Sequence, residues 1–216
     1  MEDTLVLFFA FTMLYMSVAS RLKSSIKMLC LQGLLLFLIF NQLSAHVETF
    51  NYIFLAFETL VIKMLVIPIF IWKIAKKNET FTDTEPSMPR FYSLVIATLI
   101  LFFGFIFAAI SRHHLLVTNP IPFGISISTI ILSLFFITVR KKILTAIIGY
   151  IMMENGIFLL SLSIEKEMPL VVNAGVLLDL FIAVFVLGFL VHRIDRTFDK
   201  DTMDVLVQLK DSENDD

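Results

Sequence analysis

The sequence has little cysteine and little charge. One of its 216 residues is cysteine and 17% are charged, whereas an average soluble domain is about 25% charged. Cys30 alone cannot form an intrachain disulfide or supply the thiolates of an iron–sulfur cluster. The sequence contains no phosphate-cradling glycine loop, HExxH or GxSxG pattern. We therefore expect no enzyme that acts alone, and no cofactor held by this chain.

Apolar residues are in large excess. Hydrophobic residues make up 58% of the chain, which includes 23 phenylalanines, and the mean hydropathy is +0.89. Apolar runs occupy residues 5–20, 28–45, 50–72, 91–110, 121–139, 143–164 and 170–191. Most approach the ~20 residues that a helix needs to span a bilayer, and they lack the alternation of a transmembrane strand. The sequence predicts an all-α, polytopic membrane protein with about seven transmembrane helices, in contact with lipid and not with nucleic acid.

Basic residues are concentrated on one side of this arrangement. With seven helices, fourteen of the 17 lysines and arginines share a side, and Arg112 and Lys166 lie on the other. The residues of the basic side are Arg21, Lys23, Lys27, Lys73, Lys76, Lys77, Arg90, Arg140, Lys141, Lys142, Arg193, Arg196, Lys200 and Lys210. The positive-inside rule then predicts an external N-terminus and a cytoplasmic C-terminus. Because residues 1–4 lack the basic region of a signal peptide, the first run is expected to be a retained helix.

The longest connection divides the chain into two expected helical parts. Residues 1–77 form a three-helix part, 78–90 a cytoplasmic loop, 91–192 a four-helix part and 193–216 a cytoplasmic tail. The tail carries apolar residues before an acidic end, and either docking on a cytoplasmic partner or a frayed end explains it. His113 and His114 are adjacent and fall in an expected external loop, so a metal site is not expected there.

Four ionisable residues fall inside the apolar runs: Glu58, Lys63, Glu154 and Asp179. Charged groups at bilayer depth are costly and usually face the protein interior or a wet cavity. With a helix rise of ~1.5 Å per residue, Glu154 and Asp179 lie at nearly the same level, close to the midplane. Burial disfavours the charged form of each group and a nearby opposite charge restores it, so such groups can exchange protons.

The spacing of these residues predicts some pairs and excludes others. Glu58 and Lys63 are five residues apart and would be poor partners on an α-helix. We therefore expect Lys63 to pair with a carboxylate from another helix. Glu58 is nearer the outer end, which favours a structural or solvated role.

A polar path and a static arrangement both explain the remaining groups. Asn155 and Asn173 would support a path through Glu154 and Asp179 by binding water or donating hydrogen bonds. Alternatively, these carboxyls form structural ion pairs or hydrogen bonds between helices. Pro68 is expected to kink the third helix.

Three segments carry a resemblance to a known family. They are Glu58–Pro68, Arg140–Gly156 and Leu177–Val184, and the tail at Asp201–Lys210 fits the same family. Over essentially its whole length the chain resembles hydrogenase-4 component E. From about residue 121 it is also similar to the small three-helix membrane subunit of complex I and of multisubunit cation/proton antiporters.

The resemblance implies a non-redox subunit of a complex I-like assembly in the inner (cytoplasmic) membrane, such as a nickel–iron hydrogenase or formate hydrogenlyase. Its partners would be antiporter-like and quinone-channel-type membrane subunits and a cytoplasmic hydrogenase or redox module. The nickel–iron centre and iron–sulfur clusters would belong to those partners. Glu154, Asp179 and Lys63, with Glu58, would contribute to a proton or sodium path coupled to electron transport. In the complex I subunit the middle-helix glutamate lies nearer position 151, about a turn from Glu154.

Two other classes of protein compete with this interpretation. A scaffold would seal larger membrane subunits together and hold its buried charges in static pairs. A retinal photoreceptor or independent transporter would match the helix count. The photoreceptor is disfavoured because the last predicted helix contains Asp179 and no lysine.

Overall fold

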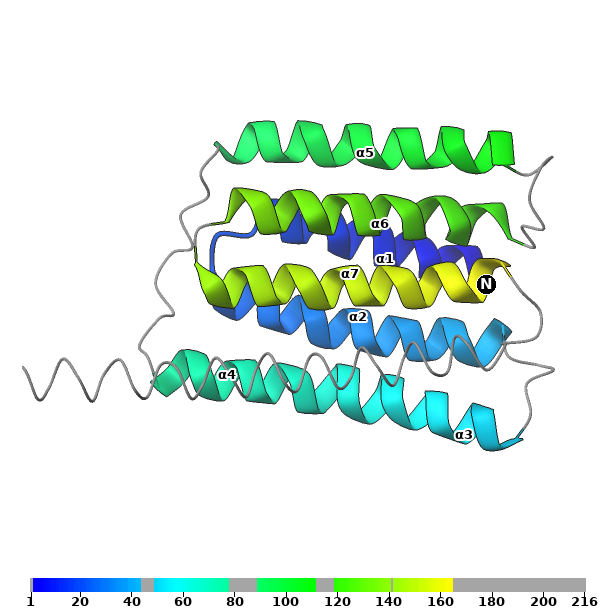
Figure 1. Ribbon diagram of the computed structural model, residues 1–216, viewed down its shortest axis with the longest axis horizontal. Helices are drawn as coiled ribbons and strands as arrows, with labels where there is room; N and C mark the ends of the chain where they lie inside the picture. The colour runs from blue at the N-terminus through cyan, green and yellow to red at the C-terminus, as the bar shows by residue number, and fades with distance from the viewer. Residues whose placement is uncertain (1, 44–48, 78–88, 112–118, 141, 165–216) are drawn as a thin grey trace, which may run out of the picture. The chain divides into compact units, whose positions relative to one another are not determined.

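The computed structural model describes residues 2–43, 49–77, 89–111, 119–140 and 142–164. All regular secondary structure in these ranges is helical, as expected. The elements are α1 (Glu2–Val18), α2 (Leu22–Leu43), α3 (Thr49–Phe57), the π-helix η1 (Glu58–Val66), α4 (Ile67–Lys77), α5 (Arg90–Ser111), α6 (Pro120–Val139) and α7 (Ile143–Ile164). The helices lie side by side along a common direction (Figure 1).

In the described part of the chain, five helical segments are long and apolar enough to cross a membrane. They are Leu22–Gln42, Tyr52–Lys76, Arg90–Ser111, Pro120–Val139 and Leu144–Ser163, and Asp3–Val18 is a shorter apolar helix. The predicted multi-pass helical membrane protein is thereby supported. The expected seventh helix at 170–191 lies outside the described residues, so the count of seven and the orientation stay predictions.

The second helix begins earlier than its apolar run. The sequence places residues 21–27 in a basic connection, but α2 starts at Leu22, so Lys23 and Lys27 lie in its first turns. A lysine stem can lie along apolar surface while its ammonium reaches a polar layer. The Lys23 ammonium lies 5.9 Å from the centre of the Trp72 ring of α4.

Helices from before and after the 78–88 segment pack against one another. Helix α6 contacts α1, α5 and α7, and α2 contacts α1, α7 and the continuous α3–η1–α4 helix. On α5 the buried positions are small residues, which let neighbouring helices approach closely. These are Ser93, Ala97, Gly104, Ala108 and Ser111. Large α5 side chains such as Phe102 and Phe103 are exposed, as expected on a lipid-facing surface.

The described basic residues gather at one end of the helices. The C-terminal ends of α1, α4 and α6 lie beside the N-terminal ends of α2, α5 and α7 (left in Figure 1). This end, called the basic end below, carries Arg21, Lys23, Lys27, Lys73, Lys76, Lys77, Arg90, Arg140 and Lys142. Among the described residues, Lys63 is the single lysine or arginine that lies away from it.

Candidate functional site: a buried charge cluster

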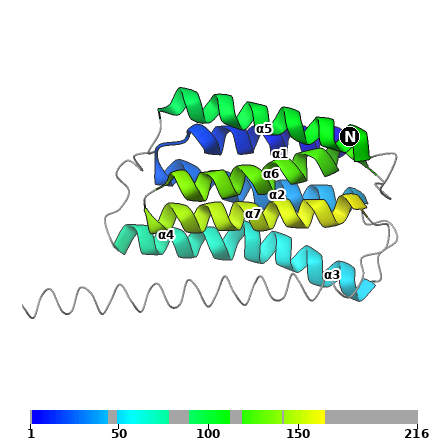
Figure 2. The same ribbon diagram turned by 45° about the horizontal axis from the view of Figure 1, so that its top comes forward.

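The third span changes its backbone pattern ahead of a proline. Residues Glu58–Val66 form a nine-residue π-helix, and the N–H of Ile67 bonds to the carbonyl of Ile62, five residues back. Pro68 follows at once and has no N–H to donate. The span is bent, with α3 inclined to α4 (Figure 2), and the π segment lies immediately before the proline that was expected to kink it. Such segments are rare and frequently occur at functional sites.

The π-helix brings Glu58 and Lys63 together. Hydrogen bonding from i to i+5 puts residues five apart one turn from each other, on the same side of the helix. Lys63 Nζ lies 3.9 Å from Glu58 Oε1. The expectation that these residues are poor partners was wrong because it assumed α-helical spacing.

Lys63 also meets a carboxylate from another helix, as the sequence predicts. Its Nζ lies 3.6 Å from Glu154 Oε1 of α7 and 5.0 Å from the centre of the Phe158 ring, one turn further along α7. The exposed fractions of Glu58, Lys63 and Glu154 are 2%, 4% and 5%. The solvated role considered for Glu58 is therefore wrong within this bundle. Glu58, Lys63 and Glu154 are called the charge cluster below.

A glycine on α2 makes room for the π-helix at the level of Lys63. A Cβ atom added to Gly33 would lie 2.8 Å from both Cα and N of Met64 and 3.0 Å from the carbonyl carbon of Lys63. These are backbone atoms, so they cannot move aside cheaply. Gly33 could not be recognised from the sequence as a close-contact position, since isolated glycines are common in transmembrane helices.

A chain of buried hydrogen bonds continues from α7 into α2 and α1. Asn155 Nδ2 donates to Gln32 Oε1 at 3.4 Å, and Gln32 Nε2 donates to Thr12 Oγ1 at 3.1 Å. Thr12 in turn donates to the carbonyl of Phe9 at 2.6 Å. Asn155 was predicted as a supporting residue, whereas Gln32 and Thr12 were missed. A glutamine near the start of the apolar run 28–45, well before the polar pair Asn41 and Gln42 near its end, was the available sign of Gln32.

The remaining predicted site residues have no described position. Asp179 and Asn173 lie outside the described residues, as do His113 and His114. Within the described ranges, Asn155 Oδ1 has no hydrogen-bond partner although it is buried. No group of three or more His, Cys, Asp or Glu side chains in these ranges could hold a metal ion.

The sequence is similar to hydrogenase components and to an uncharacterized protein. No family model and no solved structure matches the sequence. The chain is 26% identical over 168 residues, 77% of each chain, to hydrogenase-4 component E of Escherichia coli K12, and the same holds for that of Shigella flexneri. The chain is similar to hydrogenase-4 component E. It is also 31% identical to uncharacterized protein Rv0085 of Mycobacterium tuberculosis over 93 residues. This aligned segment covers 43% of this chain and 41% of that protein.

The resemblance to hydrogenase-4 component E expected from the sequence is thus confirmed, and its quoted segments include the charge cluster. With Lys63 protonated and both carboxyls ionised, the cluster carries a net charge of −1. One added proton would neutralise the cluster. Because burial of uncompensated charge is costly, this neutralisation would be favoured. Opposite unit charges ~4 Å apart attract by about 4 kcal/mol at an effective dielectric constant near 20. Such an arrangement can both join helices and hold an exchangeable proton.

Proposed function

We propose that this chain is a non-redox membrane subunit of a hydrogenase complex of the complex I-like type, and that its charge cluster forms part of a proton path. The observation that carries the proposal is the placement of Lys63 Nζ at 3.9 Å and 3.6 Å from two buried carboxylates of different helices. The similarity to hydrogenase-4 component E supports membership of a hydrogenase complex.

The lysine favours a proton over sodium as the ion. A resident ammonium repels a second cation at short range, whereas a proton can be accepted by either carboxylate. Because Glu58 and Glu154 lie on different helices, a small movement of the Lys63 side chain would shift its contact from one carboxylate to the other. We propose Asp179 and Asn173 as further members of this path, and Asn155 Oδ1 as an acceptor for water.

Electron transfer belongs to the partners in this proposal. Antiporter-like and quinone-channel-type membrane subunits would adjoin the chain, and a cytoplasmic hydrogenase module would hold the nickel–iron centre and iron–sulfur clusters. The chain would lie in the inner membrane, and its basic end would face the cytoplasm by the positive-inside rule. Formate hydrogenlyase is one assembly of this type.

The test is proton translocation by vesicles that contain the whole complex. Glu154→Gln and Glu58→Gln keep side-chain size and remove a titratable group, and Lys73→Gln at the exposed basic end is the matched control. We expect equal assembly for all variants, with proton uptake per electron lowered in both glutamate variants and unchanged in the control. A tightly coupled complex would instead lose proton uptake and redox turnover together.

The scaffold alternative gives a different result. If the charge cluster only seals helices together, the glutamate variants would lose subunits from the purified complex. Unchanged pumping by an intact complex that carries Glu154→Gln would contradict the proton path directly.

A further inference from the structure

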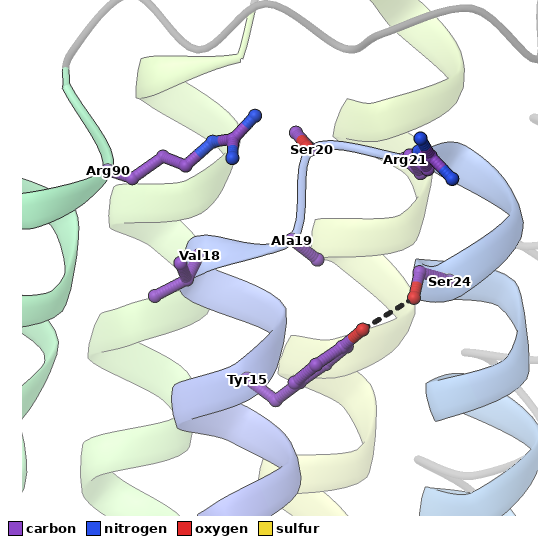
Figure 3. A pocket seen from close by; sticks show the side chains of 7 residues that line it. All are labelled: Tyr15, Val18, Ala19, Ser20, Arg21, Ser24 and Arg90. Carbon is purple, nitrogen blue, oxygen red and sulfur yellow. Dashed lines mark hydrogen bonds between the residues drawn. The ribbon is translucent and has the colours of Figure 1, made fainter.

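A pocket of about 260 Å³ opens at the basic end, between α1, the start of α2 and the start of α5. Its polar lining comes from Tyr15, Ser20, Arg21, Ser24 and Arg90 (Figure 3). Arg90 extends from α5 towards the loop between α1 and α2 (Figure 3). The hydroxyls of Tyr15 and Ser24 are hydrogen-bonded to each other at 2.7 Å. We call this the arginine pocket.

The arginine pocket has a positive charge on both sides. Arg21 and Arg90 are exposed, and no described residue that lines the pocket is acidic. Beside the pocket, the buried Arg140 donates from Nη2 to the carbonyl of Ala19 at 2.8 Å. Burial, and secondly the charge of Arg90, lower the pKa of Arg140. The guanidinium stays protonated, so an anion in the pocket would offset the repulsion between these arginines.

An apolar groove of about 330 Å³ lies next to the arginine pocket, between α1 and α2. Tyr15 lines both, and the groove continues along Phe11 and Phe8 of α1 and along Met28, Leu31 and Leu35 of α2. Since α1 runs towards the basic end, Phe11 and Phe8 lie successively deeper, at ~1.5 Å per residue. Phe8 and Phe11 are 60% and 66% exposed. The groove therefore leads from the pocket towards the bilayer interior.

We propose that the arginine pocket and this groove together bind one anionic phospholipid. The phosphate would lie between Arg21 and Arg90, because guanidinium groups donate paired hydrogen bonds to phosphate oxygens. An acyl chain would lie in the groove. Basic pockets between transmembrane helices on the cytoplasmic side bind anionic headgroups in this way. The groove distinguishes a lipid from free phosphate, which would fill the pocket alone. This inference needs only a membrane location and is independent of the proton path.

The test uses the full chain in neutral detergent and native mass spectrometry, with phosphatidylglycerol, phosphatidylcholine and inorganic phosphate as separate probes. We expect one tightly held phosphatidylglycerol. Loss of one charged hydrogen-bond donor should weaken its binding about tenfold or more, so Arg21→Gln and Arg90→Gln should each show this loss. Lys73→Gln and Lys76→Gln remove exposed charges from the same end but outside the pocket, and should bind normally.

A second pair of variants tests the groove. Leu31→Trp should fill it and weaken phosphatidylglycerol binding, whereas Leu99→Trp on the exposed face of α5 should not. Thermal unfolding of each variant checks that the fold is kept, which the exposure of Arg21 and Arg90 favours. Equal binding of phosphatidylcholine, or equal losses in the lysine controls, would overturn the proposal. Competition by inorganic phosphate with no effect of Leu31→Trp would show a soluble-anion site instead.

Discussion

Replacing Lys63 by methionine is the most direct perturbation of the charge cluster. Methionine keeps an unbranched side chain of similar length and removes the ammonium. The carboxylates of Glu58 and Glu154 then lose the ammonium that lies 3.9 Å from the first and 3.6 Å from the second. Both carboxylates are buried, so water cannot replace the lost partner without opening the bundle.

The expected cost follows from this geometry. The Coulomb attraction of each contact is about 4 kcal/mol at an effective dielectric constant near 20, but the cost of removing the charges from water offsets much of it. Measured losses on removing one partner of a buried ion pair are about 3–5 kcal/mol. We therefore expect Lys63→Met to lower the free energy of unfolding by about 3–5 kcal/mol. Adding Glu154→Gln should recover part of this loss, because it removes one of the two negative charges that have lost the Lys63 ammonium. Lys73 is exposed, so Lys73→Met should change the free energy of unfolding by about 0.5 kcal/mol or less.

The assay is denaturant-induced unfolding of the full chain in mixed micelles, followed by helical circular dichroism. Wild type, Lys63→Met, Lys63→Met/Glu154→Gln and the Lys73→Met control are compared under one condition. A Lys63→Met variant as stable as the control would refute the reasoning, because the ammonium would then contribute nothing to holding η1 against α7. A double variant less stable than Lys63→Met would refute it as well.

Three further substitutions test the surroundings of the cluster. Gly33→Ala should destabilise the chain by about 1–3 kcal/mol through overpacking, and should lower the protection of η1 amides in hydrogen exchange. Gln32→Leu removes the hydrogen bonds that Asn155 and Thr12 make to Gln32, at a cost of about 1–3 kcal/mol for each. Its free energy of unfolding should therefore fall by more than that of an exposed control such as Leu31→Ala. Arg140→Gln removes the charged hydrogen bonds to the carbonyls of Ser17 and Ala19, each worth about 1.5–3 kcal/mol, and should therefore speed proteolysis and amide exchange of the α1–α2 loop. An unaltered loop would show that Arg140 does not hold it in place.

The helices were predictable because their length and apolarity are set by the bilayer. Among the described residues up to 164, each apolar run lies mainly in a helix. The basic residues Arg21, Arg90 and Arg140, which follow or precede successive helices, indicated which helix ends lie together. The site was predictable in part. The apolar surroundings of the ionisable groups singled out Glu58, Lys63 and Glu154, and a partner for Lys63 from another helix was predicted correctly, although the spacing argument behind it assumed an α-helix and wrongly excluded Glu58.

The pairing of Glu58 with Lys63 was not predictable by the same reasoning. It depends on a backbone hydrogen-bond pattern that side-chain periodicity does not encode, although Pro68 marks where an α-helical pattern must be interrupted. The hydrogen bond between Gln32 and Thr12 likewise depends on the rotation of α1 against α2. Gly33 allows α2 and η1 to approach closely. This role can be recognised only once the backbone of Lys63 and Met64 is placed opposite the glycine.

Neutralising the whole charge cluster separates a proton path from a scaffold. In the variant Lys63→Met/Glu58→Gln/Glu154→Gln the charge cluster itself carries no charge, and replacing a buried ionic group by neutral residues of similar volume is often close to neutral in stability. We expect this variant to unfold within about 1–2 kcal/mol of wild type, more stable than Lys63→Met, and to assemble into its complex. If the cluster carries protons, vesicles with this intact complex should translocate fewer protons per electron. If the cluster is a static joint, the same complex should pump normally, since the joint has been replaced and not broken. Normal pumping would therefore contradict the proton path, even if Lys63→Met alone had abolished activity by unfolding the chain.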